Sequence, residues 1–290
     1  MTARVLVTGG SGFLGGFVTP LLAARGYEVL ALARTAAAAA VVSGRGARPV
    51  LGDLDDPRSL DAAFDCEADA LVNLASLGFG HAPGIVAAAE GAGLARVVFV
   101  STTSIFTTVP AATTPVRVEA EHVIRSSGLE WTIIRPTMIY GGAGDRNLWR
   151  LLRLLRRSPV VPLPGGGDRL QQPVHGADLA HAIVSAVANA SAVGHAYNIG
   201  GPRPLTLREL VLAAGHAVGR RPRLVPVPLA PAVAGLRAYE RLSARPLLRA
   251  EQLRRLEEDK SVDLDDARRD LGFGPRSFAE GIAEEAALLP

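Results

Sequence analysis

A glycine-rich segment near the N-terminus has the spacing that most clearly predicts chemistry. It reads Thr-Gly-Gly-Ser-Gly-Phe-Leu-Gly over residues 8–15 and directly follows apolar residues 5–7. Gly9 would permit a tight turn, Gly12 would let the backbone approach a phosphate, and Gly15 would let a helix pack closely on a strand. Amides at the start of that helix would face the phosphates of a dinucleotide. The predicted cofactor-binding residues of this segment are Gly9, Ser11, Gly12, Phe13, Leu14 and Gly15.

The end of the next predicted strand indicates which dinucleotide is bound. An acidic residue about 20 positions after the glycines would bind the ribose 2′-hydroxyl of NAD. The sequence has Leu32-Ala33-Arg34 there instead. A guanidinium suits a 2′-phosphate through forked, charged hydrogen bonds, so we expect NADP(H). A solvated arginine at a helix start is the alternative for Arg34, and Arg45 and Arg48 are weaker candidates that we expect to face solvent.

Four hydroxyl residues follow the fifth predicted strand, in the order Ser101-Thr102-Thr103-Ser104. One of them could donate a hydrogen bond to the carbonyl of a substrate. Thr103 is the first candidate for this catalytic role and Thr102 the second, while Ser101 is expected beside the cofactor. The alternative is that these hydroxyls only bind backbone groups at the strand end.

Strands and helices must position these residues, and the hydrophobic pattern predicts where those elements lie. Short β-branched runs alternate with helical patterns through the first half, which favours a parallel sheet covered by helices. Crossovers of one hand would then align the carboxyl ends of the strands along one edge, where ligands bind. The expected strands are 4–8, 28–33, 48–51, 70–74, 97–101 and 131–135, and the expected helices are 13–25, 35–42, 57–64, 84–92 and 115–127.

Beyond residue 135 the pattern loosens into connections rich in glycine and proline. A helix over 178–188, which Asp178 is expected to cap, and a strand over 196–199 would return to the sheet. The fold class is therefore α/β, a doubly wound Rossmann sheet with a smaller, mostly helical C-terminal substrate lobe. Residues 1–135 plus 173–200 form the predicted dinucleotide domain, and residues 136–172 plus 201–290 form the predicted lobe.

The composition and charge of the chain limit the classes of partner that we expect. The net charge of +3 comes from basic residues spread along the chain, so we expect no nucleic-acid partner. The exception is a run of four arginines from Arg150 to Arg157, which we expect on the solvated face of an amphipathic helix. The sequence has no apolar run long enough for a membrane span, no signal peptide, and only one cysteine, Cys66, so we expect a cytoplasmic protein. No histidines, cysteines or carboxylates have metal-ligand spacing, and the oligomeric state stays open.

Several segments together resemble the extended and atypical short-chain dehydrogenase/reductases. Besides the glycine segment, residues 52–54 are similar to that family's adenine-contacting turn, residues 73–76 to the end of its fourth strand, and residues 135–141 to its nicotinamide-side loop. The resemblance covers nearly the whole chain. It implies further cofactor-binding roles for Asp53, Leu54, Leu74, Ala75, Ser76, Pro136, Thr137 and Met138.

One part of the family pattern is missing. In the resembled family a tyrosine protonates the reacting oxygen, and a lysine four residues later lowers its pKa and holds the nicotinamide ribose. Alignment puts Thr113 and Arg117 at these two places, and Lys260 is the only lysine of the chain. Threonine is too weak an acid for this role, whereas Arg117 could still bind the ribose but not exchange protons.

Three functions fit this pattern. The first is an NADPH-dependent ketoreductase acting on a small, aromatic substrate without a protein acid, as the resemblance to atypical members that reduce polycyclic aromatic polyketides, among them angucyclinone ketoreductases, implies. A phenol beside a quinone carbonyl could protonate the product itself. The second is a redox-silent NADP(H)-binding structural or regulatory module, like accessory subunits of respiratory complex I. The third, a nucleotide-sugar epimerase or dehydratase, is disfavoured because it needs the missing pair.

Overall fold

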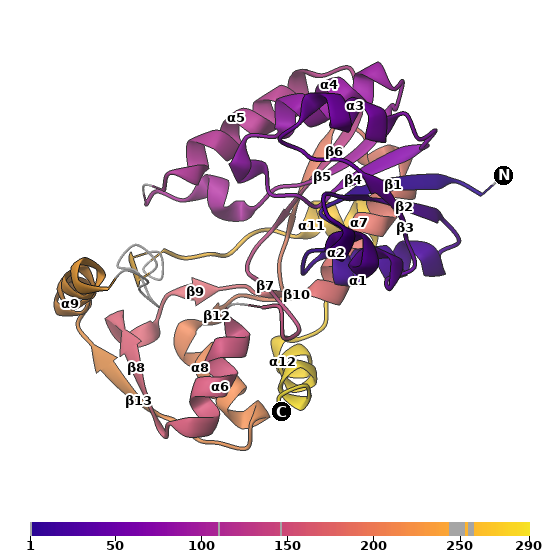
Figure 1. The fold of residues 1–290 in the computed structure, drawn as a ribbon. Helices are drawn as coiled ribbons and strands as arrows, with labels where there is room; N and C mark the ends of the chain where they lie inside the picture. Colours follow the sequence, from indigo (N-terminus) through magenta and orange to yellow (C-terminus); the bar gives the residue numbers. More distant parts are fainter. Residues whose placement is uncertain (1, 110, 146, 244–252, 255–257) are drawn as a thin grey trace.

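A seven-stranded parallel sheet runs through the larger part of the protein (Figure 1). The computed structural model describes residues 2–109, 111–145, 147–243, 253–254 and 258–290. The strand order is β11-β6-β5-β4-β1-β2-β3, so the chain moves outward from β1 in one direction and from β4 in the other. Such a reversal leaves a crevice at the carboxyl ends of the two strands. The strands are β1 (Arg4–Thr8), β2 (Glu28–Ala33), β3 (Arg48–Leu51), β4 (Ala70–Asn73), β5 (Arg96–Val100), β6 (Glu130–Pro136) and β11 (His195–Ile199).

Helices cover both faces of this sheet, and the strands are apolar on both sides as a result. Val5 and Val7 of β1 pack toward one layer of helices, whereas Leu6 packs toward the other. The first layer contains α1 (Gly15–Ala24), α2 (Ala36–Ser43) and α7 (Gly176–Ala188), and the second contains α3 (Pro57–Phe64), α4 (Ala82–Gly91) and α5 (Thr113–Ser126). The doubly wound Rossmann sheet predicted from the sequence is confirmed.

At most of the element ends, the predicted boundary differs from the observed one by one or two residues. Helix α4 begins at Ala82 rather than at the predicted residue 84, because Pro83 occupies the first turn, where a missing amide hydrogen costs nothing. Asp178 does not cap α7, contrary to our expectation. The cap is His175, whose Nδ1 accepts a hydrogen bond from the Ala177 amide at 3.3 Å, and Asp178 instead binds Arg276.

A smaller lobe lies beside the strand edge and has a core of its own. Its helices are α6 (Leu148–Arg157), α8 (Leu207–Ala217), α9 (Leu229–Leu242) and α12 (Phe278–Ala287). The described residues add short strand pairs to the predicted helices, since runs such as Val-Val-Pro-Leu-Pro favour extended backbone. The pairs are β8 (Val160–Pro164) with β13 (Arg223–Val227), β7 (Ile139–Tyr140) with β10 (Val174–His175), and β9 (Leu170–Gln171) with β12 (Leu205–Thr206).

One C-terminal segment returns from the small lobe to the large domain. Helix α11 (Asp265–Leu271) packs against α7 and β11, and Leu264, Leu271 and Phe273 join the core of the sheet. These contacts lead us to propose that α11 belongs to the large domain, whereas the other predicted domain boundaries stay predictions. Residues 244–252 and 255–257 of the predicted lobe lie outside the described residues.

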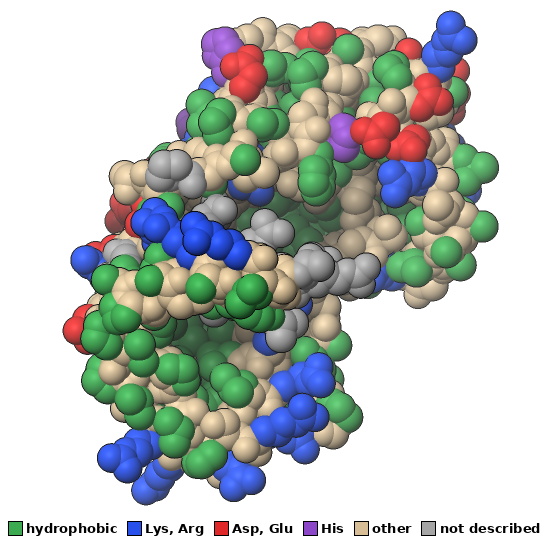
Figure 2. All heavy atoms as spheres, turned by 60° about the vertical axis from the view of Figure 1, so that its left-hand side comes forward, with side chains coloured by type: hydrophobic (Ala, Val, Ile, Leu, Met, Phe, Trp, Pro, Cys, Tyr) green, Lys and Arg blue, Asp and Glu red, His purple; other side chains and the backbone are tan. Residues whose placement is uncertain are grey.

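The two parts also differ in surface charge. Figure 2 shows basic side chains gathered on the small lobe and acidic side chains mainly on the large domain. Arg150, Arg153, Arg156 and Arg157 of α6 are all exposed, as predicted for the polar face of an amphipathic helix. Across the described residues, no helix combines the length and the hydrophobicity that crossing a bilayer requires.

Candidate functional site

The glycine segment forms a tight turn between β1 and α1. Gly9 has a φ of +70°, which favours glycine, and a Cβ there would lie 2.8 Å from the Ala75 backbone nitrogen. The Gly12 amide donates to the Gly9 carbonyl at 3.0 Å and closes the turn. A Cβ on Gly15 would lie 2.2 Å from the Gly10 carbonyl oxygen. The closest approach that Gly15 permits is therefore to the turn itself rather than to the strand that we expected.

The start of α1 fits the pyrophosphate of a dinucleotide. Leu14 occupies the cap position and supplies no side-chain hydrogen bond, and the first turn has no acidic residue. Because no side chain caps this helix start and no carboxylate lies in its first turn, the helix dipole there favours an anion. The Phe13 ring packs edge-on against Phe17 at 5.4 Å and lies close to Gly144, where a Cβ would be 2.7 Å from Phe13 Cδ2. Ser11 and Gly12 are exposed.

The ends of β1 and β4 are joined at the crevice. The Thr8 hydroxyl donates to Asn73 Oδ1 at 2.5 Å, and the Asn73 amide donates to the Ala75 carbonyl at 3.1 Å. Leu74 and Ala75 thereby lie directly against Gly9. Ser76 is exposed and caps the short helix η1 (Leu77–Phe79), since its hydroxyl accepts from the Gly78 amide. The residues predicted from these two distant segments come together at one place.

Arg34 lies at the end of β2, as predicted, but it is not an isolated cation. Its Nε is 3.8 Å from Asp53, and its Nη1 is 4.0 Å from Asp55. The side chain is 66% exposed, so it remains free to move toward a ligand. Asp53 and Leu54 follow β3, with Leu54 packed against the core and Asp53 partly exposed near the crevice.

Arg45 occupies a position that we did not expect. Instead of facing solvent, its Nη1 donates to the carbonyls of Gly10 and Gly12 at 2.6 and 2.8 Å. Burial lowers the pKa of this guanidinium. Nothing in the local sequence distinguishes Arg45 from Arg48, because the contact depends on how α2 packs beside the turn.

The candidate catalytic hydroxyls bind backbone groups. The Thr103 hydroxyl donates to the Pro136 carbonyl at 3.3 Å, and Thr102 Oγ1 accepts from the Ser104 amide at 3.2 Å. Thr102 thereby caps η2 (Thr103–Phe106). Ser101 is buried at the end of β5, and its amide donates to the Ile134 carbonyl. In this structure Thr102 and Thr103 therefore make the backbone contacts of the alternative interpretation, in which these hydroxyls only bind backbone groups at the strand end.

A different hydroxyl cluster surrounds Arg117 on α5. Its Nη1 donates to Thr113 Oγ1 at 2.9 Å and to Ser104 Oγ at 3.2 Å. The guanidinium also lies against η1, where a Cβ on Gly78 would be 3.1 Å from Nε. Thr113 and Arg117, which we predicted to stand at the places of the family's tyrosine and lysine, thus contact each other, and Arg117 also contacts the Ser104 hydroxyl. A guanidinium and two hydroxyls, all able to donate hydrogen bonds, converge there.

The predicted nicotinamide-side loop is clamped at the end of β6. The Thr137 amide donates to the Ile199 carbonyl at 2.9 Å, and its hydroxyl donates to the Gln172 carbonyl at 2.5 Å. Pro136 is buried, and Met138 packs against the core of the small lobe. Tyr140, which belongs to this loop, is 1% exposed, and its burial raises the pKa of the phenol. Tyr140 is therefore a packing residue and not an acid at the site.

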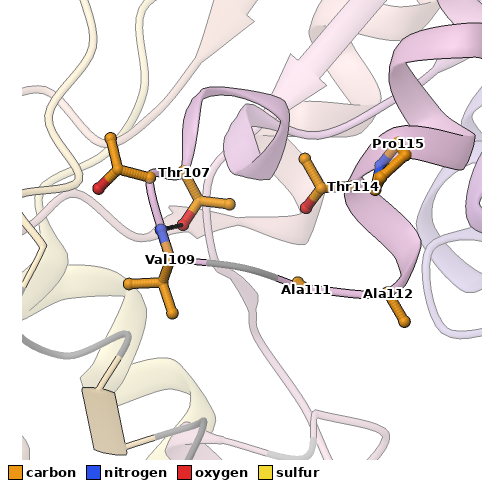
Figure 3. A pocket seen from close by; sticks show the side chains of 7 residues that line it. Thr107, Val109, Ala111, Ala112, Thr114 and Pro115 are labelled. Atoms are coloured by element: carbon orange, nitrogen blue, oxygen red, sulfur yellow. Dashed lines mark hydrogen bonds between the residues drawn. The ribbon is translucent and has the colours of Figure 1, made fainter.

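A cavity of about 450 Å³ opens beside the start of α5 (Figure 3). Small side chains line it, among them Thr107, Val109, Ala111 and Thr114. Glu258, from the C-terminal part of the chain, holds this loop. Its carboxylate accepts from the Thr107 hydroxyl, from the Thr108 amide and hydroxyl at 2.6 and 2.7 Å, and from the Val109 amide at 3.1 Å. The sequence carries no signal for this contact, since Glu258 is 149 residues from Val109.

The geometry thus offers a dinucleotide cradle at the crevice, a cationic hydroxyl cluster at the next strand ends and an adjoining cavity. Among the described residues, no three His, Cys, Asp or Glu side chains are grouped to hold a metal ion. The sequence agrees with this class of site, because residues 9–190 match a family described as NAD(P)H-binding. This chain belongs to the NAD(P)H-binding family.

Three relatives show the range of proteins that this chain is similar to. It is 31% identical to mitochondrial NADH dehydrogenase [ubiquinone] 1 alpha subcomplex subunit 9 of Arabidopsis thaliana, over 80% of this chain and only 63% of that protein. It is 29% identical to the NAD(P)H azoreductase of Xenophilus azovorans, over 78% of this chain and 77% of that one. It is 27% identical to the 4-hydroxy-2-methyl-3-oxo-4-farnesyl-3,4-dihydroquinoline-1-oxide ketoreductase of Stigmatella aurantiaca, over 94% and 92% of the two chains.

The fold has close counterparts among solved structures. The UDP-glucose 4-epimerase of Thermus thermophilus, solved with NAD, superposes with a TM-score of 0.74 over 98% of each chain. The identity is only 22%, so this likeness concerns the fold.

Proposed function

We propose that the protein is an NADPH-dependent ketoreductase that transfers hydride to a ketone or quinone carbonyl. The proposed substrate is a polycyclic aromatic polyketide. When bound, the cofactor supplies hydride to the carbonyl carbon, and the carbonyl oxygen takes up one proton. The observation that carries the proposal is the contact of Arg117 with Thr113 and Ser104, which keeps a cation and hydroxyls where the family has its acid and lysine. These groups can hold and polarise a carbonyl but do not protonate it.

The proton would then come from the substrate or from water. A phenol hydrogen-bonded to the reacting carbonyl provides a donor that is already in position, so the protein needs only to orient the ring system. The loop of residues 107–109 and the neighbouring cavity would receive that ring system, since small side chains leave room beside the cluster. The relatives named as an azoreductase and as a ketoreductase support a reductase, and the dihydroquinoline in the second name contains an aromatic ring, which supports the choice of an aromatic substrate.

We further propose NADPH as the preferred cofactor, with Arg34 at its 2′-phosphate and Gly9, Ser11, Gly12, Leu14 and Gly15 around its pyrophosphate. The experiment is a fluorescence titration of the purified protein with NADPH and with NADH. NADPH should bind more tightly, and Arg34→Ala should erase the preference. Equal affinity of the wild-type protein for the two cofactors would refute this assignment.

Turnover is tested by following NADPH absorbance at 340 nm with a panel of quinones and hydroxylated polycyclic ketones. Reduction should be fastest where a phenol lies beside the carbonyl, and methylation of that phenol should slow it.

The second candidate is a redox-silent NADP(H)-binding module. It is favoured by the replacement of the acid pair with Thr113 and Arg117 and by the relative named as an NADH dehydrogenase subunit. Binding of NADPH without turnover of any aromatic ketone would favour this candidate over the reductase.

A further inference from the structure

The loop of residues 141–145 lies where the small lobe meets the dinucleotide turn. It follows β7 and leads toward α6 of the small lobe. A Cβ on Gly144 would lie 2.7 Å from Phe13 Cδ2, and a Cβ on Gly141 would lie 2.4 Å from His175 Nε2. Phe13 belongs to the glycine turn and His175 caps α7, so one side of this loop packs against the large domain.

A buried carboxyl of α12 contacts the same loop from the small lobe. Glu285 is fully buried, and its Oε2 accepts from the Gly141 amide at 2.9 Å. Its Oε1 has no hydrogen-bond partner among the described residues. An ionised carboxylate that is buried with an unsatisfied oxygen is strongly unfavourable, whereas a protonated carboxyl carries no charge. The site therefore favours the protonated form.

A second buried carboxylate strengthens this preference. Asp145 is 5% exposed and stands at the other end of the loop, where its amide donates to the Gly142 carbonyl at 2.9 Å. Burial and the charge of Asp145 raise the pKa of Glu285 to about 7, although the Gly141 and Gly142 amides act in the opposite direction. The ordinary pKa of a glutamate is about 4.5.

The other charged groups around α12 do not neutralise Glu285. Arg276 binds Asp178 of α7 at 3.0 Å and also binds Glu284, the outward neighbour of Glu285. Glu284 Oε2 is 4.0 Å from His175 Nε2, and burial lowers the pKa of His175. Burial raises the pKa of the Tyr140 phenol, which stays uncharged. Helices α6 and α8 contribute leucine, valine and alanine side chains to the core on which α12 packs.

We infer that Glu285 is a pH-sensitive latch, which in its protonated form holds α12 and the loop of residues 141–145 against the large domain and which releases them when it ionises. Ionisation places a second negative charge beside Asp145, and an outward movement of α12 would let water reach the carboxylate. The latch is fully closed below about pH 4.5 and is lost as the pH rises to about 7, because the folded protein binds this proton more tightly. The inference does not depend on the proposed reductase activity.

Hydrogen exchange of the whole protein, measured by mass spectrometry between pH 5 and pH 8, tests the latch. Protection factors correct for the effect of pH on free amides, and they are compared between α12 and α4 of the large domain. In the wild-type protein the protection of α12 should fall by on the order of 10- to 100-fold from pH 5 to pH 8. At pH 8 α12 should exchange before α4, because the latch opens without unfolding of the sheet. In Glu285→Gln the protection of α12 should stay level across this range.

Asp145→Asn tests the charge beside the carboxyl. Asparagine keeps a side-chain oxygen for the start of α6, where Asp145 accepts from the Asn147 and Leu148 amides at 2.7 and 2.8 Å. It removes the negative charge that raises the pKa of Glu285, so the fall in protection should be complete at a lower pH than in the wild-type protein. Glu119→Gln, at an exposed position of α5, is the matched control and should follow the wild-type profile.

The other outcomes would overturn the inference. Equal protection of α12 and α4 at pH 8 would show that Glu285 titrates only when the whole protein unfolds. A wild-type fall in Glu285→Gln would mean that a different group titrates. Protection that rises with pH would assign the effect to His175, because a lowered pKa acts in the opposite direction. If Glu285→Gln did not fold, Asp145→Asn would decide, and an unchanged profile in that variant would refute the latch.

Discussion

Arg117 is the residue on which the proposed chemistry depends most. Its guanidinium organises Thr113 and Ser104, which come from α5 and η2. We predict that Arg117→Gln lowers kcat/KM for ketone reduction by on the order of 10- to 100-fold, because it removes the charged donor. Thr113→Val should lower it by less than about 5-fold, since Thr113 is not the acid. The measurement is steady-state NADPH oxidation.

The control for this prediction is Arg125→Gln, which removes an exposed arginine from the same helix. It should keep wild-type kinetics. A Thr113→Val variant as impaired as Arg117→Gln would mean that the threonine hydroxyl takes part in proton transfer after all.

At the level of elements, the joint between β1 and α1 depends on Gly15. A Cβ at this position would lie 2.2 Å from the Gly10 carbonyl oxygen, which cannot move aside as a flexible side chain can. We predict that Gly15→Ala lowers the free energy of unfolding by about 2–4 kcal/mol and abolishes nucleotide binding. Urea denaturation and cofactor titration measure the two effects.

Gly91 provides the matched control for Gly15. It lies in α4, and a Cβ there meets nothing within 4 Å. Gly91→Ala should leave nucleotide binding unchanged and raise stability by up to about 1 kcal/mol, because alanine favours a helix. A Gly15→Ala protein as stable as Gly91→Ala would contradict the close packing of the turn.

The contact of α12 with the loop after β7 introduces a pH dependence. Glu285 is fully buried, its Oε2 accepts from the Gly141 amide at 2.9 Å, and burial together with Asp145 raises its pKa to about 7. The folded state therefore holds this proton more tightly than the unfolded state, so stability falls as the pH rises from about 4.5 to about 7. We predict that Glu285→Gln removes this fall and stabilises the protein at pH 8 by about 1–3 kcal/mol.

Thermal unfolding between pH 5 and pH 8 tests this prediction. Glu119→Gln, a change at an exposed position of α5, is the control and should keep the wild-type pH profile. If Glu285→Gln kept it too, the carboxyl would be ionised in the folded protein.

At the scale of the whole molecule, Glu258 joins the C-terminal part of the chain to the cavity loop. Its carboxylate binds the backbone and hydroxyls of residues 107–109 and fixes that wall of the cavity. We predict that Glu258→Ala raises KM for the ketone by about 5- to 50-fold while changing the dissociation constant of NADPH by less than about 2-fold, because the dinucleotide cradle is built elsewhere. Steady-state kinetics and cofactor titration provide the two values.

Asp259→Asn serves as the control for Glu258. The neighbouring carboxylate holds the Leu170 amide rather than the cavity loop, so KM should stay near the wild-type value. A parallel rise of KM in both variants would mean that the whole segment, and not the Glu258 contact, shapes the cavity.

The sheet and the glycine turn could be predicted from the sequence, and so could the proposed replacement of the family's tyrosine and lysine by Thr113 and Arg117, because these features depend on residues close together in the chain. Strand periodicity and the conformational freedom of glycine act locally, so they can be recognised without knowing the packing. Even Thr113 and Arg117, four residues apart on one helix, have a predictable contact.

Which distant side chains contact these elements depends on the tertiary structure. It turned Arg45 onto the Gly10 and Gly12 carbonyls, brought Glu258 to the cavity loop and directed Thr103 to a backbone carbonyl. Arg45 and Arg48 are alike in the sequence, and only the packing of α2 beside the turn separates them. Contacts between residues 33 to 151 positions apart depend on how the elements dock, which no local pattern of residues encodes.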